Sequence, residues 1–68
     1  MFLVLLYDRL NEVDIYSCSL VFKNRYKAEF FAKRYSYLHK CFVRIHIIGS
    51  EMFYKSYRDG EFLAHGEG

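Results

Sequence analysis

The sequence contains no proline and only four glycines, two of which lie in its last three residues. We therefore expect short, tight connections and no linker of the Pro- or Gly-rich kind. Cysteine is also scarce, since Cys18 and Cys41 could form at most one disulfide. We expect both thiols to be reduced, because the chain has no Cys-x-x-Cys spacing and no feature of a secreted protein.

Long apolar runs are absent as well. The run at residues 1–7 ends at Asp8 and Arg9, and it lacks the basic start and the small-residue cleavage site of a signal peptide. It is also far shorter than the ~20 apolar residues that span a bilayer. These absences predict a cytoplasmic protein without a membrane anchor.

Aromatic residues are abundant, with seven Tyr and seven Phe in 68 residues. A chain this short buries only roughly 60% of its unfolded surface, so some of these rings must lie at the surface. Small domains without disulfides or metals often gain stability by oligomerisation. We therefore expect the chain to form a homodimer.

Four segments have the residue types of β-strands, and one has the pattern of a helix. The predicted strands cover residues 2–7, 13–22, 41–48 and 51–57, and the predicted helix covers residues 24–38. Asn11 is expected at positive φ in the first turn, Gly49-Ser50 suits a two-residue type II′ hairpin, and Arg58-Asp59-Gly60 suits another turn. Residues 62–64 could add a short strand or a clamp.

This element order predicts an α+β fold, ββαββ, in which one helix covers one face of a four-stranded antiparallel sheet. Residues 1–64 would form the single domain and residues 65–68 a frayed tail. In the strand at 41–48, the core face is expected to carry Cys41, Val43, Ile45 and Ile47. In the strand at 13–22, alternation puts Val13, Ile15, Ser17, Ser19 and Val21 on one face and Asp14, Tyr16, Cys18, Leu20 and Phe22 on the other. The uncovered face of the sheet would hold part of the set Tyr16, Phe42, His46, Tyr54 and Tyr57.

The predicted helix is apolar on two sides. Asn24 is a good N-cap, and the core stripe is expected to be Ala28, Phe31, Ala32, Tyr35 and Leu38. The opposite side carries Tyr26, Phe30 and Tyr37, flanked by Lys23, Lys27, Lys33 and Arg34. A helix on one sheet needs a single apolar face, so the second face is a candidate contact surface. Its predicted partner-binding residues are Tyr26, Phe30, Lys33, Arg34 and Tyr37.

Charge is distributed unevenly along the chain. Residues 23–44 hold seven basic residues and one acidic residue, whereas the remainder holds three basic and seven acidic ones. The same aromatic and basic residues could therefore stack bases and meet phosphates, and a nucleic-acid-binding helix face is the alternative interpretation. The acidic remainder and the absence of an RNP-type aromatic strand motif favour a protein partner instead.

Catalytic and metal-binding patterns are not found. Cys18, Cys41, His39, His46 and His65 match no zinc-finger or zinc-ribbon spacing. No serine lies in a nucleophile motif, and no glycine-rich phosphate loop occurs. We therefore expect a protein that is not an enzyme and needs no cofactor or metal.

The stretch at residues 16–33, Tyr-Ser-Cys-Ser-Leu-Val-Phe-Lys-Asn-Arg-Tyr-Lys-Ala-Glu-Phe-Phe-Ala-Lys, resembles small phage early proteins. In these proteins a strand, a polar N-cap, a helix with paired alanines and a further strand follow one another, and anti-CRISPR and antitoxin-like proteins are examples. The resemblance implies a protein that binds and inhibits a host enzyme or defence complex in the host cytoplasm. Many such inhibitors are strongly acidic, so the net charge of +2 argues against DNA mimicry. A homodimeric structural module remains a further alternative.

Overall fold

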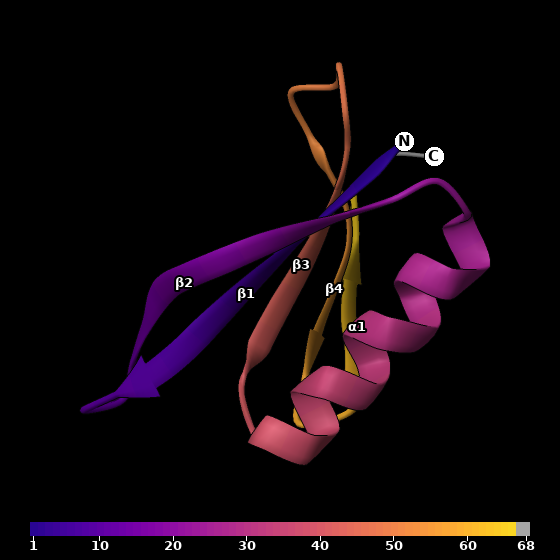
Figure 1. Ribbon diagram of the computed structural model, residues 1–68. Coiled ribbons are helices and arrows are strands. Elements are labelled where there is room, and N and C mark those ends of the chain that lie inside the picture. The colour runs from indigo at the N-terminus through magenta and orange to yellow at the C-terminus, as the bar shows by residue number, and fades with distance from the viewer. Residues whose placement is uncertain (67–68) are drawn as a thin grey trace.

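The chain forms one antiparallel sheet with a single helix against one face (Figure 1). The computed structural model describes residues 1–66. Its elements are β1 (Phe2–Leu10), β2 (Val13–Phe22), α1 (Arg25–His39), β3 (Phe42–Ile47), β4 (Phe53–Arg58) and β5 (Glu61–His65). The strand order is β2-β1-β3-β4-β5. The predicted α+β arrangement of a helix on an antiparallel sheet is confirmed, with β5 as a fifth strand.

The first hairpin turns at Asn11 and Glu12, whose φ values are 51° and 64°. Two consecutive positive φ values match a type I′ turn, whose twist suits the strands on either side. The positive φ expected at Asn11 is therefore confirmed. β1 extends to Leu10, further toward this turn than the predicted strand at residues 2–7, whereas β2 begins at Val13 as predicted. β1 lies in the interior of the sheet, between β2 and β3.

A β-bulge interrupts the alternation of β2. Leu6 pairs with Cys18 and Tyr7 with Tyr16, so Ser17 is an extra residue in the strand. Beyond the bulge the faces exchange, and the continuous alternation predicted for residues 13–22 is wrong. The helix-facing side of β2 carries Val13, Ile15, Cys18, Leu20 and Phe22, and the open side carries Asp14, Tyr16, Ser19 and Val21.

The β3–β4 connection is longer than predicted. The Ser50 N–H donates to the Ile47 carbonyl at 3.0 Å, and Gly49 has a φ of 97°. Glycine at the second central position suits a type II turn, which splays the strands more than a primed turn does. Residues 48–52 therefore form the connection, β4 begins at Phe53, and the two-residue hairpin at Gly49-Ser50 is wrong.

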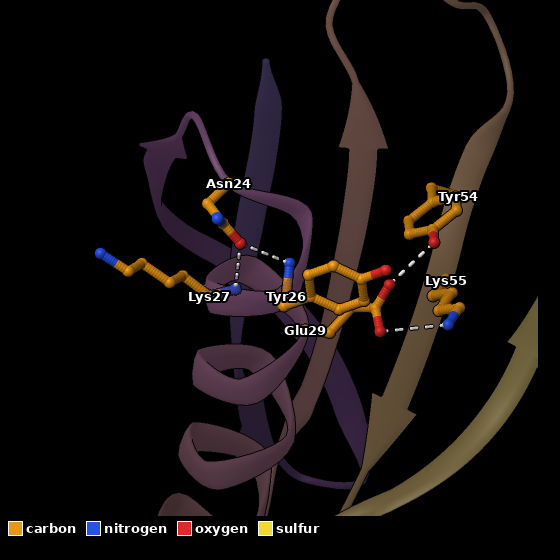
Figure 2. Close-up of polar contacts among 6 residues, drawn as sticks. All are labelled: Asn24, Tyr26, Lys27, Glu29, Tyr54 and Lys55. Atoms are coloured by element: carbon orange, nitrogen blue, oxygen red, sulfur yellow. Dashed lines mark hydrogen bonds and ion pairs between the residues drawn. The ribbon is translucent and has the colours of Figure 1, made fainter.

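Helix α1 begins after Asn24, whose side-chain oxygen accepts hydrogen bonds from the N–H groups of Tyr26 (2.8 Å) and Lys27 (3.1 Å) (Figure 2). This satisfies two of the free donors at the helix start. The helix ends at Lys40, which has a φ of 50° and donates its N–H to the Ser36 carbonyl. The predicted N-cap is confirmed.

Small residues form the centre of the buried face of α1. Ala28, Ala32 and Ser36 are fully buried, while Phe31 and Tyr35 are half-buried beside them. Leu38, predicted as core, is 60% exposed. It lies about 120° around the helix from Ala32, whereas Ser36 lies within about 40°. The predicted stripe is thus correct in its alanines and wrong at Leu38.

The core lies between α1 and the central strands. On β3, the predicted inward set is confirmed, with Cys41, Val43 and Ile45 buried and Ile47 half-buried. Tyr54 and Tyr57 also lie on the helix side, although we expected them in part on the uncovered face. The reason is a shift in the β3–β4 register between Ile45 and His46, which leaves Tyr54 as an extra residue in β4. Tyr54 and the next residue, Lys55, therefore both face the helix, and Tyr54 shares that side with Tyr57.

A second tight turn at Asp59 (φ 53°) and Gly60 (φ 86°) leads into β5. The expected tail begins at residue 65, but His65 still pairs with Lys55, and the Gly66 N–H donates to the Tyr54 carbonyl at 2.9 Å. Residues 67 and 68 of that tail lie outside the described residues. Within residues 1–66, no helix has the length and apolarity needed to cross a membrane.

Candidate protein-binding groove

A surface groove, called here the α1–β5 groove, separates the outer side of α1 from the β4–β5 hairpin. It consists of two hollows, of about 590 and 320 Å³, which share Phe30, Lys33 and Gly60. Its helix wall also includes Tyr26, Glu29, Arg34 and Tyr37. Its strand wall also includes Lys55, Tyr57, Glu61 and Phe62.

Four aromatic side chains stand exposed around this groove. The exposed fractions are 73% for Tyr26, 66% for Phe30, 57% for Tyr37 and 53% for Phe62. The first three come from α1, and Phe62 comes from the edge strand β5. Exposed rings gathered around a hollow are what interfaces enrich, because each ring buries a large area with few rotatable bonds.

The floor of the groove is fixed by a hydrogen-bonded cluster. Glu29 accepts from the Tyr54 hydroxyl at 2.7 Å and pairs with the Lys55 ammonium at 3.2 Å. Figure 2 shows Glu29 and Tyr26 reaching from the first part of α1 toward β4, where the two partners of Glu29 lie. One carboxylate thus ties the helix to the neighbouring strand and leaves its side chain as part of the wall.

The protonation properties of this cluster are those of a structural contact. Burial raises the pKa of Tyr54, and its hydrogen bond to Glu29 raises it further. Burial alone would lower the pKa of Lys55, but the hydrogen bond and charge of Glu29 outweigh it, so this pKa is raised too. Tyr54 therefore stays neutral and Lys55 charged at neutral pH, and neither is an activated nucleophile or base.

Ser36 fixes the other end of the groove. Its buried hydroxyl donates to the Lys33 carbonyl and accepts from the Gly60 N–H, both at 2.9 Å. The β4–β5 turn is thereby held against the last turns of α1. A Cβ at Gly60 would lie 2.8 Å from the Cβ of Tyr37, so only glycine allows the turn to approach this closely.

The charge of the groove is concentrated on two helix residues. Glu29 already neutralises Lys55, whereas neither Lys33 nor Arg34 forms an ion pair within residues 1–66. Both are exposed beside the aromatic rings. Glu61 lies on the opposite wall. The helix wall therefore offers cations to an incoming ligand without first breaking an internal salt bridge.

The open face of the sheet also carries aromatic and basic residues, but these contact one another. The Arg44 guanidinium lies 5.4 Å from the ring centroids of both Phe42 and Phe53, and Tyr7 lies 5.2 Å from Phe42. Phe42 and Tyr7 are accordingly only half-exposed. Such a face holds its rings against its own guanidinium groups, which occupy ring planes that base stacking would need.

Comparison with known proteins adds no relative. No family model, curated protein or solved structure matches the chain.

Within residues 1–66, no three His, Cys, Asp or Glu side chains lie close enough together to hold a metal ion. Cys18 is exposed, Cys41 is buried, and both are free thiols as predicted.

All five residues predicted to bind a partner line this one groove. Tyr26 lines the larger hollow, Arg34 and Tyr37 line the smaller one, and Phe30 and Lys33 line both. The sequence analysis missed the whole strand wall. Phe62 is the aromatic residue that completes the set, and its sequence signal was only a short apolar stretch after an Asp-Gly turn. Its place opposite the helix depends on the pairing of β5 with β4.

Proposed function

We propose that this protein is a non-catalytic binding module that holds a segment of a partner protein in the α1–β5 groove. One observation carries this proposal: four exposed aromatic side chains from two separate elements surround a hollow beside Lys33 and Arg34, which form no ion pair within residues 1–66. A partner that fills the groove would bury these rings and gain charged contacts that cost no existing salt bridge.

The groove favours a partner segment with an apolar or aromatic anchor next to acidic residues. The anchor would lie between Phe30 and Phe62, and a carboxylate would reach Lys33 or Arg34. The resemblance to small phage early proteins supports a bacterial enzyme or defence complex as the partner class. On this proposal, binding takes place in the cytoplasm, the host cytoplasm for a phage-encoded chain, and inhibits the partner by occupying its surface.

The test is capture of a partner from a bacterial lysate by the tagged chain, followed by mass spectrometry. We expect one enzyme or complex to be retained by the wild-type protein. The double substitution Phe30→Ala/Phe62→Ala should reduce its recovery at least tenfold, because the two opposing anchors of the groove are removed. Recovery of the same partner by this variant at wild-type levels would refute the groove as the binding site.

Tyr16→Ala is the matched control. Tyr16 is 52% exposed, close to Phe62 in accessibility, but it lies on the open face of the sheet. This variant should retain the partner. Circular dichroism spectra and melting curves of all variants show whether each remains folded.

A nucleic-acid ligand is tested with the same variants. If nuclease treatment of the lysate abolishes capture, and replacing Lys33 and Arg34 by Glu lowers the salt dependence of binding, the helix face binds phosphates and the protein-partner proposal is wrong. Under the protein-partner proposal, capture survives nuclease treatment. The effect of the two charge reversals then reports how acidic the partner segment is.

A further inference from the structure

The far edge of the sheet, opposite the α1–β5 groove, is formed by β2. Its ten residues pair only with β1 within residues 1–66, so the outer row of its backbone N–H and C=O groups has no strand partner. Figure 1 shows β2 as a long outermost strand, and the turn end of the β1–β2 hairpin projects away from the helix. Exposed edges of this kind are templates for pairing with another chain.

Apart from the bulge at Ser17, this edge lacks the features that usually prevent such pairing. The chain has no proline, β2 contains no lysine or arginine, and its single charged residue, Asp14, is bound to Arg58. Ile15 and Val21 are 47% and 56% exposed on the edge. The opposite edge differs, because β5 has only five residues and ends in Glu61 and His65. Short length and the charged Glu61 protect β5, whereas β2 is twice as long and contains no proline, lysine or arginine.

The bulge at Ser17 makes the two faces of β2 symmetric about its middle. On the helix side lie Val13, Ile15, Cys18, Leu20 and Phe22, and on the open side Asp14, Tyr16, Ser19 and Val21. Reversing the strand about the point between Ser17 and Cys18 exchanges eight of these residues within their own sets and places Cys18 opposite the bulge residue Ser17. Without the bulge, the same reversal would place helix-side residues opposite open-side residues.

Two copies of β2 can therefore pair antiparallel in a register that keeps the side chains on either side of the bulge on matching faces. In this register Val13 lies opposite Phe22 of the second copy, and Ile15 opposite Leu20. The residues just beyond the strand ends are Glu12 and Lys23, both exposed, and they lie opposite one another across the pair. Two-fold symmetry repeats this opposite-charge contact at both ends.

We propose that the chain forms a homodimer through β2, with the two-fold axis between Ser17 and Cys18, so that two five-stranded sheets become one continuous sheet. The occupant of this edge is a second copy, because the strand is complementary to itself in face pattern and in end charge. This goes beyond the proposed function. It leaves both α1–β5 grooves open at the outer ends of the dimer, since β5 lies at the opposite edge from β2.

Sedimentation equilibrium over a micromolar concentration range is the first test. The wild-type chain should approach twice the monomer mass, and Ile15→Lys should remain at the monomer mass, because a lysine at the edge opposes strand pairing. Leu63→Lys is the matched control at the other edge, where Leu63 is 51% exposed, and it should stay dimeric. A monomeric wild type, or a dimer that Ile15→Lys leaves intact, overturns the proposal.

The register is tested by charge exchange. Glu12→Lys and Lys23→Glu should each weaken the dimer severalfold, and the double exchange should restore it, because each new lysine then faces a new glutamate of the second copy. If the two single effects simply add in the double variant, these residues do not meet and the proposed register is wrong.

Cross-linking provides a measurement that does not depend on the edge variants. In this register the two Cys18 residues lie one position off a direct pair, within the Cα separation of about 4.4–6.8 Å that a disulfide spans. With Cys41→Ala as background and diamide as oxidant, we expect Cys18 to give a covalent dimer. A Cys18→Ser/Leu63→Cys chain in the same background should not. Equal cross-linking of both chains would indicate collision alone and would overturn the register.

Discussion

The substitution Ser36→Ala tests how the helix holds the β4–β5 turn. Ser36 is fully buried, and its hydroxyl bridges the Lys33 carbonyl and the Gly60 N–H at 2.9 Å each. Alanine leaves the half-buried Gly60 N–H without its acceptor, and an unsatisfied donor costs about 1–3 kcal/mol when water cannot reach it. Alanine also favours the helix by up to about 0.5 kcal/mol over serine. The expected net loss is about 0.5–3 kcal/mol.

This loss is large for so small a chain. At roughly 0.05–0.15 kcal/mol per residue, the whole domain has a free energy of unfolding of about 3–10 kcal/mol. Each kcal/mol corresponds to about 4–8 °C in melting temperature for a domain of this size. Urea unfolding should therefore show a clearly lower midpoint for Ser36→Ala with an unchanged m value.

Amide hydrogen exchange locates the effect. The Gly60 amide should lose protection in Ser36→Ala more than the amides of β3 do, because the bond that holds it is the one removed. Lys27→Ala, an exposed position on the same helix, serves as control and should change stability by less than about 0.5 kcal/mol. If Ser36→Ala keeps both the wild-type midpoint and the Gly60 protection, the bridge does not hold the turn.

Three further predictions concern His46, two phenylalanines of the helix and the two cysteines. Burial lowers the pKa of His46, so the unfolded chain binds a proton at a higher pH than the folded chain does. The free energy of unfolding should therefore fall as the pH drops below about 6.5. His46→Gln should show a flatter profile of urea midpoint against pH. Phe31→Ala should cost about 3 kcal/mol in thermal unfolding, and Phe30→Ala less than about 1 kcal/mol, because only the first ring packs on the core; equal losses would contradict this packing. Reducing agent should leave the melting temperature unchanged, since Cys18 and Cys41 are free thiols, whereas a native disulfide would add about 2–4 kcal/mol.

Local chemistry in the sequence determined most of the elements. Asn24 as N-cap, Asn11 in the first turn and the Asp59-Gly60 turn each depend on the conformations that one or two residues can adopt. The β3 pattern depends on strict alternation over a strand that has helix contact on one side. Signals of this range can be read from a few neighbouring residues. The helix, the first four strands along the chain and the fold class could therefore be predicted.

The helix wall of the groove was predictable for the same reason. Residues that repeat at helical spacing share a face whatever the rest of the chain does, so Tyr26, Phe30 and Tyr37 could be placed together. Which residue lies at the centre of the buried face was not predictable. Hydropathy favoured Leu38 over Ser36, whereas the Gly60 N–H supplies the partner that makes a buried serine favourable.

Only the tertiary structure decided the registers between strands. The bulge at Ser17 and the shift beside Ile45 reassign faces on β2 and β4, and both depend on pairing with residues far away in the sequence. The same is true of Phe62, which reaches the groove because β5 pairs with β4. A one-residue change of register moves every following side chain to the other face of a sheet. The sequence by itself therefore determined which elements form and which helix residues stay exposed, and long-range pairing decided which strand residues meet them.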